Sequence, residues 1–186
     1  MTKKYNEQAQ EAILKAREIK SRNVLGTYPY KHLFRVSDRI IKTGDQEMDW
    51  PGLAEAGEAT GKIFVKLSRF DVGSWVMLGV MYKRQVERNE FEFDNYKNVG
   101  HGCYLLDSNR WCYSHSNEDY NCKPLGFEYG ANDVIKVEIF DNLVRFSRMA
   151  FGWEEEKFEL PFEKPQNDEL VFAMGIKGEH TELTLV

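Results

Sequence analysis

The spacing of apolar residues along the chain changes near Pro29. Before it, apolar side chains recur every three or four positions and predict one helix over residues 4–20; the stripe consists of Tyr5, Ala9, Ala12, Ile13, Ala16 and Ile19. After it, apolar and polar residues alternate with a period of two, which is typical of strands. We therefore expect a helical extension over residues 1–28 and a β domain over residues 29–186.

The predicted helix has a thin stripe that is rich in alanine. An isolated helix of this length is marginal in water, so its stripe needs a surface to pack on. Two surfaces remain open at this point. The helix either packs on the edge of the β domain or docks on a partner.

The β domain predicts a series of short strands. In the segment NDVIKVEIF, three β-branched residues (Ile135, Val137 and Ile139) face one way, while the charged residues between them face the other. This alternation indicates an antiparallel strand that is buried on one face. We expect strands at 33–43, 62–70, 74–82, 102–107, 110–114, 133–140, 143–149, 156–160, 169–176 and 181–186.

Turn residues separate these strands. Asp141-Asn142 lies between two alternating segments and predicts a tight hairpin. Two segments are expected to be long loops: 44–61, rich in glycine and acidic residues, and 83–100, rich in charge and asparagine. Many short strands without interleaved helices indicate an all-β sandwich or barrel.

Charge and composition exclude some function classes. The net charge is −5 and the pI is near 5.5, whereas a nucleic-acid binder needs a concentrated basic surface. No apolar run approaches the roughly 20 residues that span a bilayer, and the N-terminus lacks the apolar core of a secretory signal. The three cysteines do not form the pattern of a disulfide framework. We expect a cytoplasmic protein that binds neither nucleic acid nor membrane.

A group of thiols and imidazoles is the one candidate for a metal site. His101, Cys103, Cys112, His115 and Cys122 lie close together in the sequence, but their spacing is not that of structural zinc sites. If strands 102–107 and 110–114 pair, Cys103 and Cys112 become cross-strand neighbours. Burial as small core thiols and a redox role are the alternatives. We expect packing, with no metal and no cofactor.

Catalytic patterns are weak. Cys112 and His115 are three residues apart, so on one strand their side chains point to opposite faces. No glycine-rich phosphate loop occurs, and the run Glu154-Glu155-Glu156 is more typical of a solvated edge than of a site. We therefore expect no enzymatic activity.

Three parts of the β domain resemble the SPRY family. They are GKIFVKL with GSWVMLGV (61–67 and 73–80), CYLLDSNRWCYSH (103–115) and NDVIKVEIFDNLVRF (132–146). The chain departs from the family pattern at Asn132 and Arg110, where many members have glycine. The resemblance implies a concanavalin-like sandwich of two antiparallel sheets. It also implies recognition of peptides or protein surfaces by loops at one end, without catalysis.

Aromatic residues and arginine dominate protein-binding hot spots, which suggests a partner surface. If the family topology holds, six residues cluster at one end of the sandwich: Tyr82, Arg84, Tyr104, Asn109, Trp111 and Tyr113. Trp111 and Cys112 must face opposite ways, so one of them is expected to be exposed. Trp75 is expected in the core. Segment 83–99, with its three aromatic residues, is a second candidate surface.

Three functions are compatible with these observations. The first is a non-catalytic module that recognises a peptide or protein. The second is a structural subunit of a large assembly, docked by the N-terminal helix and segment 83–99. The third is a carbohydrate-binding lectin on the same sandwich.

Overall fold

A computed structural model describes residues 33–37, 40–43, 52–71, 73–91, 93 and 95–186. The predicted helix over 4–20 and the extension over 1–28 lie outside the described residues. The described part contains two antiparallel sheets and one short helix, α2 (Lys83–Arg88). The prediction of an all-β sandwich of two antiparallel sheets is confirmed.

The larger sheet contains seven strands in the order β1-β2-β12-β4-β8-β9-β10. Every neighbouring pair is antiparallel. The strands are β1 (Leu33–Ser37), β2 (Ile40–Thr43), β4 (Lys62–Arg69), β8 (Val134–Phe140), β9 (Leu143–Ala150), β10 (Trp153–Pro161) and β12 (Glu182–Leu185).

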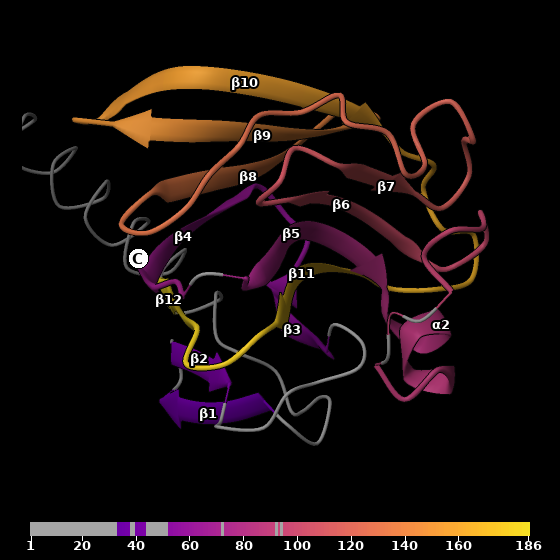
Figure 1. The fold of residues 1–186 in the computed structure, drawn as a ribbon. Coiled ribbons are helices and arrows are strands. Elements are labelled where there is room, and N and C mark those ends of the chain that lie inside the picture. The colour runs from indigo at the N-terminus through magenta and orange to yellow at the C-terminus, as the bar shows by residue number, and fades with distance from the viewer. Residues whose placement is uncertain (1–32, 38–39, 44–51, 72, 92, 94) are drawn as a thin grey trace, which may run out of the picture.

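The smaller sheet contains five strands in the order β3-β11-β5-β6-β7, also antiparallel. The strands are β3 (Gly52–Glu58), β5 (Trp75–Tyr82), β6 (Cys103–Asp107), β7 (Cys112–Ser114) and β11 (Leu170–Lys177). In Figure 1 the strands of the larger sheet descend from β10 to β1, and those of the smaller sheet descend from β7 to β3.

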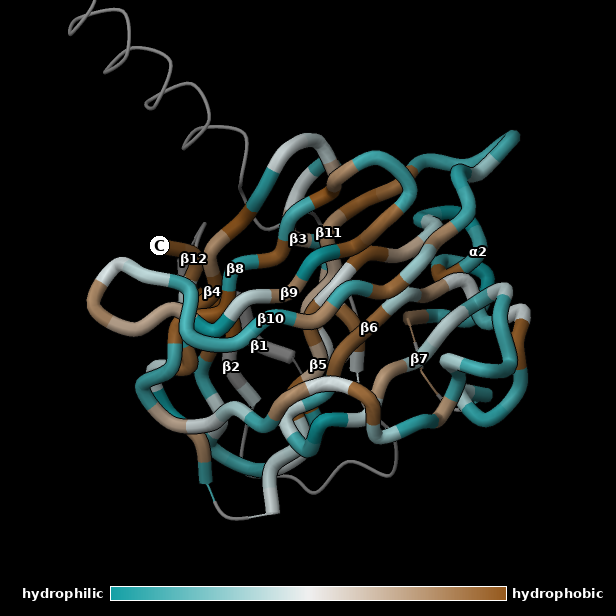
Figure 2. The backbone as a smooth tube through the Cα atoms, turned by 90° about the horizontal axis from the view of Figure 1, so that it is seen from above, coloured by the Kyte–Doolittle hydropathy of each residue, from teal (hydrophilic) through white to brown (hydrophobic). Residues whose placement is uncertain are grey.

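The main core lies between the sheets. Alternate residues of the central strands meet there, including Leu78 and Val80 from β5 and Val65 from β4, all fully buried. Gly79 allows β5 and β6 to approach closely, because a Cβ at this position would lie 2.0 Å from the carbonyl oxygen of Tyr104. Figure 2 shows the resulting apolar stretches along β5, β6 and β11 and the hydrophilic loops around them.

The outer face of the smaller sheet is also buried. A second cluster covers it, in which Met77, Met81 and Leu105 of the sheet meet Val86 of α2 and Phe93. The central strands therefore have apolar residues on both faces, which explains why β5, β6 and β11 are almost continuously apolar. The smaller sheet is a middle layer between the main core and the segment that begins with α2.

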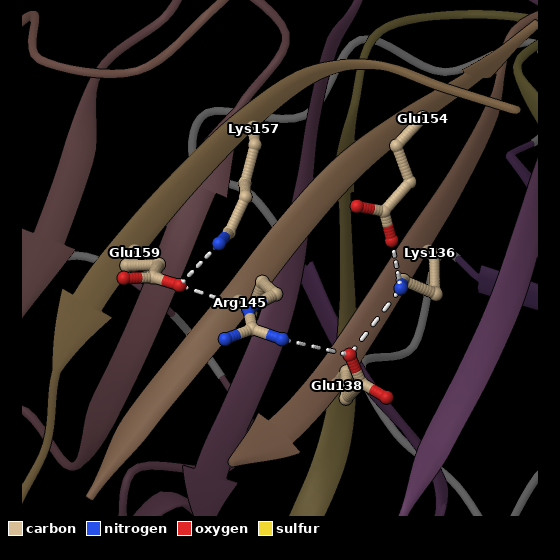
Figure 3. Close-up of polar contacts among 6 residues, drawn as sticks. All are labelled: Lys136, Glu138, Arg145, Glu154, Lys157 and Glu159. Atoms are coloured by element: carbon tan, nitrogen blue, oxygen red, sulfur yellow. Dashed lines mark hydrogen bonds and ion pairs between the residues drawn. The ribbon is translucent and has the colours of Figure 1, made fainter.

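The outer face of the larger sheet is charged. Lys136 Nζ lies 3.3 Å from a carboxylate oxygen of Glu138 and also pairs with Glu154. Arg145 extends the network through Nε, which lies 2.9 Å from Oε1 of Glu159. Figure 3 shows these contacts across β8, β9 and β10. This face is solvated. Two features protect the open edge of β10 from pairing with other strands: its charged side chains and the bulge between Glu154 and Glu156.

Two hairpins connect the last strands of this sheet. The predicted hairpin at Asp141-Asn142 is confirmed, since Phe140 pairs with Leu143 across it. The next turn contains Phe151 (φ 50°) and Gly152 (φ 86°), both left-handed. Phe151 is fully exposed at this tip, and Trp153 beside it is 79% exposed.

Three sequence predictions are wrong in detail. Segment 44–61 was expected to be a loop, yet it contains β3. Its glycines and alanines are poor strand formers, but backbone pairing with β11 holds these residues in a strand. Segment 83–100 was also expected to be a loop, yet it contains α2. The predicted strand over 33–43 is two antiparallel strands, β1 and β2.

Candidate functional site

A pocket opens beside the β6–β7 hairpin. Its volume is about 490 Å³, which is within the usual range for ligand pockets. Half of the residues that line it are aromatic, and the others are charged, polar or thiol side chains: Trp75, Tyr96, Lys97, Asp107, Asn109, Trp111, Tyr113 and Cys122. We call this the Trp111 pocket.

Asp107, the last residue of β6, organises the pocket. Its Oδ1 accepts hydrogen bonds from the backbone N–H groups of Asn109 (2.9 Å) and Trp111 (2.8 Å), which closes the turn. Its Oδ2 accepts hydrogen bonds from Trp75 Nε1 (2.5 Å) and from the Tyr113 hydroxyl (3.0 Å). One buried carboxylate thus fixes the turn and two aromatic side chains.

The aromatic rings of the pocket meet at steep angles. The ring centroids of Trp75 and Tyr96 are 5.6 Å apart with planes inclined by 82°. Those of Tyr96 and Tyr113 are 5.8 Å apart and inclined by 87°. Behind them, Phe93 contacts Tyr113 at 5.5 Å. Such edge-to-face contacts hold the rings in place, so the pocket wall is rigid and apolar.

Burial raises the pKa of Asp107, while the hydrogen bonds from Trp75, Trp111, Tyr113 and Asn109 act in the opposite direction. These four donors are an indole, a phenol and two backbone amides, and all are uncharged. The carboxylate is therefore held by hydrogen bonds from neutral groups.

Solved structures with this architecture include three at low sequence identity. The SPRY domain of human HERC1 is 13% identical with a TM-score of 0.55, and the match covers 83% of this chain and 92% of that one. The TRIM65 PSpry domain is 15% identical with a TM-score of 0.57, covering 89% and 92%. Stonustoxin is 10% identical with a TM-score of 0.57, covering 89% of this chain and 27% of that one.

The chain has the SPRY fold. At these identities the likeness concerns the fold alone. No family model matches the sequence, and no curated protein does either. The predicted resemblance to SPRY domains is confirmed at the level of the fold.

The SPRY fold brings three of the six predicted site residues together. Asn109, Trp111 and Tyr113 line the same pocket. Trp111 is 41% exposed whereas Cys112 is fully buried, so one of this pair is exposed, as expected. Tyr113 is almost completely buried, so that its ring forms the inner wall rather than the surface.

The other three predicted residues lie elsewhere. Tyr82 and Tyr104 are buried, and their hydroxyl oxygens are 3.2 Å apart. The Tyr82 hydroxyl also donates to the carbonyl of Glu163 (2.6 Å). Arg84 is exposed on α2 and donates from Nη1 to the carbonyl of Asn167 (3.2 Å). The expectation of one surface cluster of six residues is therefore wrong, because the middle sheet is covered on both faces and two of the tyrosines point into it.

The sequence did not assign several pocket residues to the site. Trp75 was expected in the core, but it is only partly buried and its indole N–H reaches the pocket carboxylate. Asp107 carries a signal that could have identified it, because an aspartate before a tight turn commonly caps backbone N–H groups. Tyr96 belongs to segment 83–99 in the sequence, yet its ring borders the Trp111 pocket.

The aromatic residues of segment 83–99 turn towards their own sheet. Phe93 is buried in the outer cluster, and Phe91 and Tyr96 are partly buried against it. Most of the exposed residues in the described part of this segment are polar, including Asn95 and Lys97, although Val99 is exposed as well. The segment therefore covers the SPRY-like domain's smaller sheet.

The cysteines are free thiols. Cys112 pairs with Leu106 and Cys103 pairs with Met81, so these two cysteines are not the cross-strand neighbours that the hairpin suggested. Burial raises the pKa of Cys112 to about 11 and that of Cys103 further. Within the described residues, no group of three or more histidine, cysteine or acidic side chains is placed to hold a metal ion.

His101 lies behind the aromatic wall of the pocket, where its ring centroid is 5.1 Å from that of Phe93. His101 is buried; its Nδ1 accepts a hydrogen bond from the backbone N–H of Cys103 (3.1 Å), and its Nε2 lies 3.2 Å from Oδ1 of Asn121. Since that oxygen also accepts from the backbone N–H of Ser114, Nε2 must be the donor. Burial lowers the pKa of His101 to about 4, so the ring is neutral at pH 7.

Among the described residues, no helix has the length and apolar character needed to cross a membrane.

Proposed function

We propose that this SPRY-like domain is a non-catalytic protein-interaction module that binds a peptide, or a loop of a folded partner, in the Trp111 pocket. The observation that carries the proposal is the combination of a half-exposed indole at the rim with rigid aromatic walls behind it. Binding pockets on proteins are typically concave and largely apolar, with a few polar groups that fix orientation. A pre-organised wall also lowers the entropy lost on binding.

The state of the thiols supports a role without catalysis. A thiolate is the reactive form of cysteine, and burial keeps the pKa of Cys112 near 11, so the thiol is protonated at neutral pH. The neutral His101 has both ring nitrogens engaged in hydrogen bonds and is not available as a base. The free thiols are typical of a reducing compartment, which favours the cytoplasm.

A second candidate function is that of a structural subunit in a large assembly. The exposed hairpin tip favours it, since Phe151 and Trp153 present two large aromatic side chains to solvent. Exposed apolar surface of this kind often marks a contact with another protein. This tip lies on the larger sheet, whereas segment 83–99, one of the two docking elements that the sequence suggested, packs on the smaller sheet.

The test compares two exposed tryptophans. The tagged full chain is used to capture proteins from native extract, as wild type, as Trp111→Ala and as Trp153→Ala. We expect Trp111→Ala to reduce the amount of captured protein at least about tenfold. An aromatic hot-spot residue that becomes buried in the interface contributes about 2 kcal/mol or more to binding. Trp153→Ala is the matched control and should retain them.

The opposite pattern would support the hairpin tip and the structural role. If the wild type and both variants captured equal amounts of protein, neither tryptophan would be part of the interface. The folded state of each variant is checked by its thermal unfolding temperature, so that loss of binding is not confused with loss of fold.

A further inference from the structure

We propose that the Trp111 pocket recognises a methylated ammonium group, presented as a methylated lysine side chain of the bound protein. This inference rests on the proposed function and adds the chemical class of the ligand. Four features of the pocket carry it: its rings, its buried carboxylate, the hydrogen bonds of that carboxylate and the position of Lys97.

The rings provide the first feature. Trp75, Tyr96 and Tyr113 lie within 6.0 Å of one another in centroid distance, and each pair is inclined by at least 58°. The face of Tyr96 is accessible to a cation, since Lys97 Nζ lies over this ring. Aromatic faces carry negative potential and attract cations, tryptophan most strongly. Trp111 adds a further indole at the mouth.

The carboxylate provides the second feature. Asp107 is 1% exposed and lines the same pocket. Its four hydrogen-bond donors are neutral groups, so they orient the carboxylate without supplying a positive charge. A cation that enters the pocket would come under the field of this charge, and such an attraction is stronger near a protein surface than in bulk water.

The hydrogen bonds select the kind of cation. Each oxygen of Asp107 already accepts two hydrogen bonds, and the Tyr113 hydroxyl uses its proton on one of them. An unmodified lysine brings three N–H donors and an arginine five, and these need acceptors once they leave water. The side chain of Asn109 at the rim can meet only a small part of that need. Methyl groups in place of N–H donors remove the problem, so a methylated ammonium fits this wall best.

Lys97 shows that a cation is tolerated beside these rings. Its Nζ lies 5.9 Å from the centroid of Tyr96, within cation–π range, while the residue itself is exposed. This ammonium is at the pocket wall and repels an incoming cation. Removing it should therefore strengthen binding of a cationic ligand and weaken binding of an anionic one.

The first experiment uses small probes with the full chain. Choline carries a quaternary ammonium, and 3,3-dimethylbutanol is its neutral isostere. Tryptophan fluorescence is followed as each probe is titrated. Cation–π attraction and the Asp107 charge should favour choline by about tenfold. Equal affinity for the two probes would show an apolar pocket without charge selectivity and would overturn the proposal.

The second experiment uses two peptide pools that are identical except for their central residue, lysine or trimethyllysine. We expect the trimethyllysine pool to bind at least about tenfold more tightly. This experiment also distinguishes a free small cation from a methylated lysine of a protein. If choline bound tightly but the two pools bound equally, the pocket would be a site for a free small cation, and the methyllysine inference would be overturned.

Two variants complete the test. Tyr96→Ala should weaken binding of the trimethyllysine pool about tenfold, and Lys97→Gln should strengthen it several-fold. Weaker binding by Lys97→Gln would indicate an anionic ligand and contradict the proposal. If native partners depend on Trp111 while the two pools bind equally, the ligand class is wrong but the proposed function stands. If capture is independent of Trp111, the proposed function itself fails.

Discussion

Asp107 shows how much a single side chain decides in this domain. Its carboxylate connects the first residue of β5, the turn after β6 and the second residue of β7. A buried charge of this kind remains in place only when its hydrogen bonds are complete, and here both oxygens are satisfied. The geometry of the pocket therefore depends on one residue that itself is barely accessible.

His101 makes stability depend on pH. Its pKa is about 4 in the folded protein, because of burial, against an ordinary 6.5 in the unfolded chain. Between these values the unfolded chain binds more protons, so the free energy of unfolding falls as the pH drops from 6.5 towards 4. The full difference corresponds to about 3 kcal/mol. Urea unfolding at a series of pH values should show this decline.

A variant without the titrating ring provides the control for this prediction. His101→Gln should be less stable than the wild type at pH 7, because the hydrogen bonds to Cys103 and Asn121 are altered. Its stability should change less between pH 6.5 and 4. The neighbouring His115, whose pKa is also lowered by burial, leaves part of the slope in place. A slope identical to that of the wild type would mean that His101 is not the responsible group.

At the scale of elements, the β9–β10 hairpin contains a strained residue. Phe151 has a left-handed backbone (φ 50°) next to Gly152 (φ 86°), where hairpins of this kind prefer Asn-Gly. A non-glycine residue in this region raises the free energy of the folded state by roughly 1 kcal/mol or more, and asparagine tolerates it best. Phe151→Asn should therefore stabilise the protein by about 1 kcal/mol, measured as a higher urea midpoint with an unchanged slope.

Phe151→Ala separates the two properties of this residue. Alanine removes the exposed ring but keeps the unfavourable backbone, so it should not stabilise the protein. Equal stabilisation by alanine and asparagine would assign the effect to the ring and not to the turn. A phenylalanine that is fully exposed and has a strained backbone fits a contact surface better than a stability role.

The sequence predicted those elements whose pattern is local. The β8–β9 hairpin follows from the alternation of Ile135, Val137 and Ile139 and from the turn at Asp141-Asn142, and all of these signals lie within a dozen neighbouring positions. β3 was missed because glycine and alanine carry no strand signal, and its pairing with β11 comes from more than 100 positions away in the chain. α2 is a helix of six residues, too short for a periodic pattern.

The same limit explains the mixed outcome at the site. Alternation tells which residues share a face, but it does not tell which face is outside when both are covered. Tyr82 and Tyr104 share a face that points into the main core, whereas Tyr113 points to the outer cluster beneath the pocket. The prediction that one of Trp111 and Cys112 is exposed is confirmed, because neighbouring side chains on a strand face opposite ways and this argument is local.

At the scale of the whole molecule, the domain has three layers: the charged larger sheet, the smaller sheet and the segment that covers it. Phe93 joins the covering segment to the pocket, since its ring contacts His101 at 5.1 Å, Tyr113 at 5.5 Å and Tyr96 at 5.9 Å. Its loss should therefore affect both the stability of the outer cluster and the wall of the binding site.

We expect Phe93→Ala to lower the free energy of unfolding by about 3 kcal/mol or more, as for other buried phenylalanines, and to weaken partner capture at the Trp111 pocket because Tyr96 and Tyr113 lose their support. Val86→Ala is the matched control: Val86 is equally buried in the same cluster but belongs to α2 and does not line the pocket. It should lower the unfolding free energy by a smaller amount, about 2 kcal/mol, and leave capture unchanged.

Partner capture is compared under conditions in which both variants are folded, as their unfolding curves show. If the two substitutions reduced capture equally, the outer layer would act on binding through overall stability. A loss confined to Phe93→Ala would show that the covering segment positions the recognition surface.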